Sequence, residues 1–126
     1  MANAPEELMS QADYDMESAE WMLSGGRLGY AIFACHLSIE KALKAIYHKR
    51  TGDVPPYTHN LIHLVKSIGL RPDENFLRVL TTLTQAQPVS RYPQGVNTSS
   101  AAFDREGVTD LIGQSKDLLQ WIKKQY

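Results

Sequence analysis

The sequence has little of what several protein classes require. Its single cysteine, Cys35, can form neither an intrachain disulfide nor a zinc site built from several cysteines, and it fits a reduced compartment. Thirteen basic against fourteen acidic side chains leave a net charge of -1. That balance removes any argument from overall charge for non-specific binding to nucleic acid, so local charge has to be considered separately.

Long hydrophobic runs are also absent. The longest uncharged apolar stretch, residues 28–39, is far shorter than the ~20 residues that a membrane-spanning helix needs. The amino terminus has no basic segment followed by an apolar run, so it does not resemble a secretory signal. We therefore expect a cytoplasmic protein without membrane contact. A length of 126 residues with 43% apolar side chains fits one soluble domain over residues 1–126.

Helical periodicity dominates the sequence, and no segment alternates apolar and polar residues for long. Leucine outnumbers valine fourteen to six, which also favours helices over strands. Apolar residues recur every three or four positions from Pro5 to Leu23, until Gly25 and Gly26 stop the first helix. The second helix should span residues 28–49, which are apolar on most sides, as expected of the most buried helix in a bundle.

Three further helices are predicted in the second half of the chain. Thr58 can cap a short helix that ends at Gly69, and Pro72 with Asp73 can open the next one. The apolar face of the short helix comprises Leu61, Leu64, Val65 and Ile68. The last helix should begin after Asp104. The apolar stripes of the last two helices comprise Phe76, Leu77, Leu80 and Leu83, and then Val108, Leu111, Ile112, Ser115, Leu118, Leu119 and Ile122.

A loop rich in Ser, Pro, Gly and Asn is predicted between these two helices, over residues 88–102. Loops of that length are uncommon in compact domains unless they are functional or mobile. The other connections are short, which places successive helices side by side. The sequence thus predicts an all-α fold, an antiparallel up-and-down bundle of four to five helices.

Charge is unevenly distributed although it nearly cancels overall. Residues 1–25 hold six acids and no base, whereas residues 27–50 hold five bases and one acid, Glu40. One interpretation is electrostatic attraction between the first two helices, in which exposed pairs contribute only ~0 to 1 kcal/mol each. The other interpretation makes the basic end of the second helix a surface that contacts phosphate.

A polar ridge runs along the second helix, because His36, Glu40, Lys44 and His48 lie four residues apart. An ion pair between Glu40 and Lys44 explains it most simply, since Glu precedes Lys in the favourable order. His36 and Glu40 could also face a metal ion, yet no further ligands are evident. Neither a metal nor a cofactor is predicted, and Cys35, on a different face, is interpreted as part of the core.

Two histidines and an arginine complete the candidate residues. His59 and His63 lie where the third helix begins and are interpreted as structural hydrogen-bonding groups. Arg91 and Tyr92, in the predicted loop, offer a guanidinium fork for phosphate and a ring on which a base can stack. Equally, Arg91 could pair with an acid of a neighbouring helix while Tyr92 packs beneath the loop. The sequence contains no recognisable catalytic triad and no glycine-rich phosphate loop.

Taken together, these segments resemble the HEPN family, the higher-eukaryote and prokaryote nucleotide-binding domain. The resemblance covers nearly the whole chain and rests on residues 12–23 with the glycine turn that follows, and on residues 30–45, 57–61 and 91–93. Its most specific part is the segment Glu-Lys-Ala-Leu-Lys-Ala that starts at Glu40. The resemblance implies a helical bundle, frequent homodimerisation, and pairing with a small nucleotidyltransferase in toxin-antitoxin-like modules.

The resemblance also bears on enzyme activity. Many HEPN proteins are metal-independent RNases, in which an arginine and a histidine four to six residues later meet their twins across a dimer interface. Arg91 stands where such an arginine would lie, but Asn97 occupies the sixth position after it, and no histidine follows His63. An acid–base pair built on imidazole is therefore missing from this loop, and the expectation leans against an enzyme.

Three functional hypotheses are compatible with these features. The first is a homodimer that binds a nucleotide or RNA, with a nucleotidyltransferase as partner and without an intact RNase motif. The second is a metal-independent RNase in which Arg91 acts with a different base, such as His59. The third is a structural interaction module whose exposed Trp21 or Trp121 covers a partner helix. The residues predicted to contact the ligand are Lys41, Lys44, His59, Arg91 and Tyr92.

Overall fold

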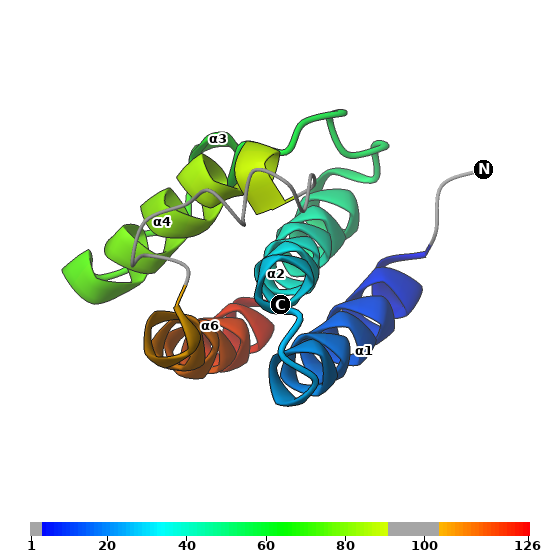
Figure 1. Cartoon of the computed structure of the whole chain (residues 1–126). Helices are drawn as coiled ribbons and strands as arrows, with labels where there is room; N and C mark the ends of the chain where they lie inside the picture. The colour runs from blue at the N-terminus through cyan, green and yellow to red at the C-terminus, as the bar shows by residue number, and fades with distance from the viewer. Residues whose placement is uncertain (1–3, 91–103) are drawn as a thin grey trace.

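The computed structural model describes residues 4–90 and 104–126, and within these ranges the chain forms five helices and no strand (Figure 1). The helices are α1 (Pro5–Ser24), α2 (Leu28–Thr51), α3 (Leu61–Ser67), α4 (Glu74–Ser90) and α6 (Arg105–Gln125). The predicted all-α bundle of four to five helices is thereby confirmed. No helix in the two described ranges is long and apolar enough to cross a membrane.

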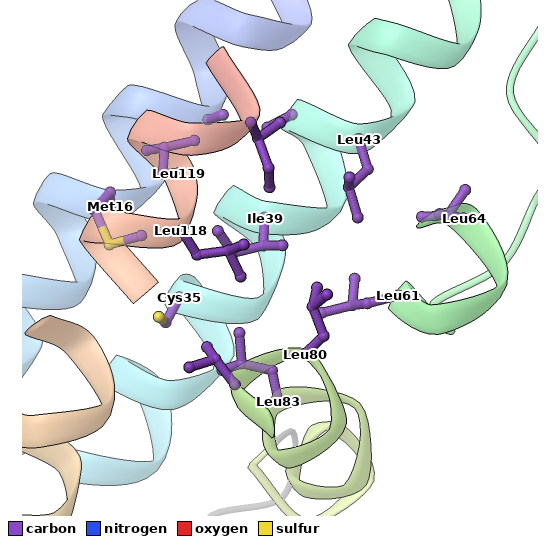
Figure 2. Packing of buried hydrophobic residues seen from close by; sticks show 14 of the residues in the cluster. Met16, Cys35, Ile39, Leu43, Leu61, Leu64, Leu80, Leu83, Leu118 and Leu119 are labelled. Carbon is purple, nitrogen blue, oxygen red and sulfur yellow. The ribbon is translucent and has the colours of Figure 1, made fainter. Parts of the chain in front are cut away.

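The central helix of the bundle is α2. It contacts each of the other four helices, with α1 on one side of it and α3 and α4 on the other (Figure 1). Its fully buried Ile39 and Leu43 pack among Leu61 of α3, Leu80 of α4 and Leu118 of α6 (Figure 2). Burial of each such side chain stabilises a fold by about 1.5–3 kcal/mol. This packing holds α2 in place in the core, and with it the polar groups that α2 carries.

Small residues bring α1 close to α2. Ala12 and Ala19 of α1 and Ala31 and Ser38 of α2 are all fully buried. The Ser38 hydroxyl donates a hydrogen bond of 2.6 Å to the backbone oxygen of Ala12, so this buried polar group is satisfied across the contact. The two helices are therefore held by close backbone approach as well as by apolar packing.

Two aspartates of α1 pair with lysines of two different helices. Asp15 pairs with Lys41 of α2 at 2.8 Å, which is the attraction between the first two helices that the charge pattern predicted. Asp13 instead pairs with Lys123 of α6 at 3.0 Å. The charge pattern of neighbouring helices could not predict this second pair, because its members are far apart in the sequence.

The cap of α3 differs from the predicted one. The side-chain oxygen of Asn60 accepts a hydrogen bond of 3.1 Å from the backbone N–H of His63, so Asn60 caps the helix in place of Thr58. A capping residue directly precedes the first helical residue, here Leu61, and Thr58 lies two positions too early. The Thr58 hydroxyl instead accepts a hydrogen bond of 3.1 Å from the backbone N–H of Asn60 and braces the turn before the helix.

The buried stripe of α4 also differs from the predicted one. Leu77, which was expected to be buried, is 41% exposed, whereas Val79 is only 3% exposed. Phe76, Val79, Leu80 and Leu83 follow the helical spacing i, i+3, i+4 and i+7, and this set faces the core. Leu77 lies one position away from that face, so its apolar character misled the prediction.

The end of α4 lies later than predicted. The helix continues to Ser90, so residues 88–90 are helical rather than part of a loop. Pro88, which was expected to begin the loop, lies in the last turn of this helix. The rest of the predicted 88–102 loop falls outside the described residues. As predicted, Asp104 caps α6, and its carboxylate accepts a backbone hydrogen bond of 2.7 Å in the first turn.

The lone cysteine is part of the core, and this gives a pH-dependent prediction. Burial raises the pKa of the Cys35 thiol to about 12, and the neighbouring Ser115 hydroxyl lowers that pKa by a smaller amount. A raised pKa means that the thiol contributes stability below its ordinary pKa of 9.0, and that this stability is lost as the pH rises toward 12. Between pH 7 and pH 10 the free energy of unfolding of the native protein should therefore fall by about 1.4 kcal/mol more than that of a Cys35→Ala variant.

Urea unfolding of both proteins at the two pH values measures this difference. The other titrating groups are common to the two proteins and cancel in the comparison. Equal losses of stability would show that the Cys35 thiol ionises without unfolding of the core.

Candidate functional site

A buried carboxylate, that of Glu40, lies in the middle of the polar ridge on α2. Glu40 is only 5% exposed. Its Oε2 accepts a hydrogen bond of 3.0 Å from Nζ of Lys44, the ion pair that their spacing predicted. Its Oε1 accepts a hydrogen bond of 2.9 Å from Nδ1 of His59 and lies 3.6 Å from Nδ1 of His36. A buried charge needs such partners, because an unpaired one costs far more free energy than the fold can offset.

His59, in the segment that links α2 to α3, is held at two points. Its Nδ1 donates to Glu40, and its backbone oxygen accepts a hydrogen bond of 2.9 Å from Nε2 of the fully buried His36. Carboxylate and carbonyl oxygens only accept hydrogen bonds, so we assign a proton to Nδ1 of His59 and to Nε2 of His36. In its neutral form the His59 ring then carries its lone pair on Nε2. Both the place and the tautomer of this imidazole are thus set by α2.

An exposed tyrosine lies beside this imidazole. Tyr57 is 98% exposed, and its ring centroid lies 6.0 Å from that of His59, with an angle of 60° between the ring planes. The His59 side chain is partly exposed. The phenol ring and the anchored imidazole therefore share one accessible surface, which we call the Tyr57–His59 surface. Flat rings at a surface are suited to stacking against a nucleobase.

The five residues predicted to contact a ligand fall into three groups. Lys44 and His59 come together, because both bind Glu40. Lys41 is not part of this group, since it pairs with Asp15 on the side of α2 that faces α1. Arg91 and Tyr92 lie outside the described residues.

The basic end of α2 has a structural use that the sequence did not reveal. Arg50 donates hydrogen bonds to the backbone oxygens of Ile68, at 2.8 Å, and Gln125, at 3.1 Å, where α3 and α6 end. Lys49 donates to the backbone oxygen of Tyr126 at 3.0 Å, and its ammonium lies 3.9 Å from the centroid of that tyrosine ring. These cations satisfy carbonyls that the helices leave open at their carboxyl ends. The surface predicted to contact phosphate is thus occupied by contacts within the protein.

His48, the last residue of the predicted ridge, is also used structurally. Its Nδ1 lies 2.8 Å from the backbone oxygen of Asp53, in the turn that follows α2. Among the residues that the structure describes, no group of three or more His, Cys, Asp or Glu is arranged to hold a metal ion. His36 and Glu40, which were considered as ligands, instead position His59.

Tyr57 is the site residue that sequence reasoning did not single out. It directly follows Pro55 and Pro56, and two prolines restrict the backbone before it. That restriction could have suggested a tyrosine held on an extended segment. The orientation of the neighbouring His59 ring could not be predicted, because His59 is bonded to Glu40 in a different part of the chain.

The comparison with known proteins agrees with this architecture. The model of the HEPN domain matches residues 5–125. The chain belongs to the HEPN domain family. Two solved structures share the fold: TT1696 from Thermus thermophilus (18% identity, TM-score 0.83, 99% of this chain and 100% of that chain covered), and ST0689, an archaeal HEPN homologue (27% identity, TM-score 0.75, 98% of each chain covered). No curated protein matches the chain.

In this HEPN chain, the most specific segment of the resemblance is structurally central. Within this segment, Glu40 provides the buried carboxylate, and Lys44 provides the ammonium that binds to it. The Thr-His pair at residues 58 and 59 provides the imidazole bound to it. Arg91 and Asn97, the positions that were compared with the arginine and histidine of the family's RNase motif, lie outside the described residues.

Proposed function

We propose that this HEPN-domain protein is a cytoplasmic homodimer that binds a nucleotide or single-stranded RNA at the Tyr57–His59 surface. The observation that carries the proposal is the anchored imidazole of His59 beside the exposed ring of Tyr57. Tyr57 offers a base an aromatic face, and His59 offers a polar ring whose orientation is fixed before binding. Arg91 and Tyr92 are proposed to add a phosphate contact and a second ring.

Lysines have a smaller part in this proposal than the sequence suggested. Lys44 donates to Glu40 and remains partly accessible, so it can attract a phosphate group without leaving its ion pair. Lys41 is paired with Asp15 on the side of α2 that faces α1. We therefore assign the primary contacts to Tyr57 and His59.

Titration with AMP, GMP and short single-stranded RNA at low salt tests the proposal. We expect binding by the native protein at ligand concentrations up to millimolar, and about tenfold weaker binding by Tyr57→Ala. The loss follows from removing one base–aromatic stack, which contributes ~1–3 kcal/mol. Tyr57 is almost fully exposed, so this change should leave the fold intact.

His63→Ala and Tyr14→Ala are the matched controls. His63 is exposed four residues after His59, and Tyr14 is an exposed tyrosine of α1. Both variants should bind like the native protein. The proposal would be overturned if the native protein bound none of these ligands, or if Tyr14→Ala and Tyr57→Ala lost binding affinity equally.

A metal-independent RNase is the second candidate, and one observation favours it. The bond between Glu40 and His59 is a carboxylate–imidazole pair, an arrangement that can orient a general base. On this hypothesis RNA cleavage in the presence of a chelator is lost in His59→Ala and in Arg91→Ala but kept in His63→Ala. Cleavage that persists without Arg91, or no cleavage by the native protein, would contradict it.

The proposed assembly is tested separately from ligand binding. Size-exclusion chromatography with light scattering should give twice the chain mass of 14.2 kDa. A strictly monomeric protein would contradict the homodimer. The proposed pairing with a small nucleotidyltransferase predicts that the two proteins copurify when they are produced together, and separate elution would contradict that pairing.

A further inference from the structure

Two large aromatic side chains of α1 are exposed on one face of that helix. Tyr14 is 69% exposed and Trp21 is 79% exposed. They are seven residues apart, which places them on the same face about two turns from one another, with Glu17 between them. We call Tyr14, Glu17 and Trp21 the outer face of α1. Trp121, the other tryptophan, is partly buried and packs against Phe76, with 5.7 Å between the ring centroids.

A hollow of about 380 Å³ adjoins this face, between α1 and α6. Met16 and Leu119, which are buried, line it, and Glu17 belongs both to its wall and to the outer face. These two apolar side chains beside the exposed rings give an apolar side chain of a partner a place to insert, within a lining that is otherwise charged or polar.

The charged side chains around the hollow are mostly acidic. Asp13 and Glu20 are already paired with Lys123 and Lys116 of α6. Glu17 and Asp117 also line the hollow, and neither forms an ion pair with any residue in the described ranges. Within the described part of the chain, no cation neutralises these two carboxylates, so they favour a positively charged partner.

We propose that the outer face of α1 and the adjoining hollow bind a basic amphipathic helix of a partner protein. Tyr14 and Trp21 are spaced to contact apolar side chains one or two turns apart on the docking helix. Glu17 and Asp117 attract its lysine or arginine side chains, and the hollow is lined by four acids, Asp13, Glu17, Glu20 and Asp117, against one base, Lys116.

A second copy of this chain fits the face less well. In a two-fold symmetric contact the outer face of α1 would meet itself, which brings the Glu17 carboxylate near the same carboxylate of the second copy. Like charges across an interface disfavour association. A nucleic acid would meet the same acidic surface and is disfavoured for the same reason.

This surface is separate from the proposed ligand site. Figure 1 shows α1 and α3 on opposite sides of α2, and His59 lies just before α3. Substitutions on the outer face of α1 should therefore leave nucleotide binding unchanged. Failure of the docking proposal would thus be distinguishable from failure of the proposed function.

Two synthetic amphipathic helical peptides with the same leucine pattern test the docking proposal, one with lysine and the other with glutamate at its polar positions. The full chain with Trp121→Phe leaves Trp21 as the only tryptophan and hence as the fluorescent reporter. The lysine peptide should shift the fluorescence emission of Trp21, and it should bind at least tenfold more tightly than the glutamate peptide. Added salt should weaken this preference.

Variants of the face and of a remote site complete the test. Glu17→Lys should remove the preference for the lysine peptide, whereas Asp53→Lys, the same charge change in the turn after α2, should keep it. Tyr14→Ala, with Trp21 still reporting, should weaken binding about tenfold, whereas Tyr57→Ala should not. Equal binding of the two peptides, equal effects of the face and control variants, or burial of Trp21 by self-association as the concentration rises would overturn the proposal.

Discussion

Replacement of Glu40 by alanine is expected to lower the free energy of unfolding by about 3 kcal/mol. The change removes a carboxylate that is 5% exposed and leaves His59 and Lys44 without their shared acceptor. Breaking a buried ion pair from one side costs about 3–5 kcal/mol, and the lower end applies because Lys44 and His59 can be partly hydrated. Urea unfolding followed by circular dichroism measures the loss.

Glu20→Ala is the matched control for this prediction. Glu20 also pairs with a lysine, Lys116 at 3.2 Å, but both side chains are about half exposed. Exposed pairs of this kind contribute ~0 to 1 kcal/mol, so the control should lose little stability. Similar losses in Glu20→Ala and Glu40→Ala would mean that burial of the Glu40 carboxylate has no energetic consequence.

Replacement of Arg50 by alanine is the second large effect, with an expected loss of about 2 kcal/mol in the free energy of unfolding. Its guanidinium donates to Ile68 at the end of α3 and to Gln125 at the end of α6. Hydrogen bonds to a charged group contribute ~1.5–3 kcal/mol each, and partial exposure lowers that contribution here. Thermal unfolding should register the change as a lower Tm.

Two further arginine variants test the geometric explanation. Arg50→Lys keeps the charge but not the two-pronged donor, so it should recover only part of the lost stability. Arg78→Ala removes an exposed arginine that donates to Asn75, three residues earlier on the same helix, and should have a small effect. Full recovery of stability in Arg50→Lys would show that charge alone stabilises these helix ends.

Local patterns in the sequence predicted much of the fold. The helical spacing of apolar residues located α1 and α2, and the capping preference of aspartate located the start of α6. The same spacing misplaced Leu77, because leucine on a helix surface cannot be told from leucine in the core when four apolar residues crowd into two turns. Thr58 and Asn60 can both cap a helix, and only the observed hydrogen bond shows which one does.

The candidate site could be predicted only where its contacts are local. Glu40 and Lys44 are four residues apart, so their ion pair followed from helix geometry alone. The bond from His59 to Glu40 crosses from the α2–α3 segment to the middle of α2, and the bond from Arg50 to Gln125 joins distant ends of the chain. Such contacts depend on how the helices pack, which hydrophobic spacing does not specify.

The structure shows which of the unevenly distributed charges are paired within the chain. Lys41, Lys44 and Arg50 of α2 are engaged with carboxylates or helix ends, whereas the outer face of α1 keeps an acid without an ion pair in the described part of the chain. We therefore assign an anionic ligand to the Tyr57–His59 surface and a basic partner to the outer face of α1. These two assignments lie on different sides of α2 (Figure 1).

Nuclear magnetic resonance of the full chain during titration with AMP or short single-stranded RNA tests the central claim most directly. We predict that the imidazole resonances of His59 and the ring resonances of Tyr57 shift with increasing ligand, while the indole resonance of Trp21 on the outer face of α1 stays in place. Shifts at Trp21 with none at His59 and Tyr57, or no shifts at millimolar ligand, would contradict the assignment of the ligand to the Tyr57–His59 surface.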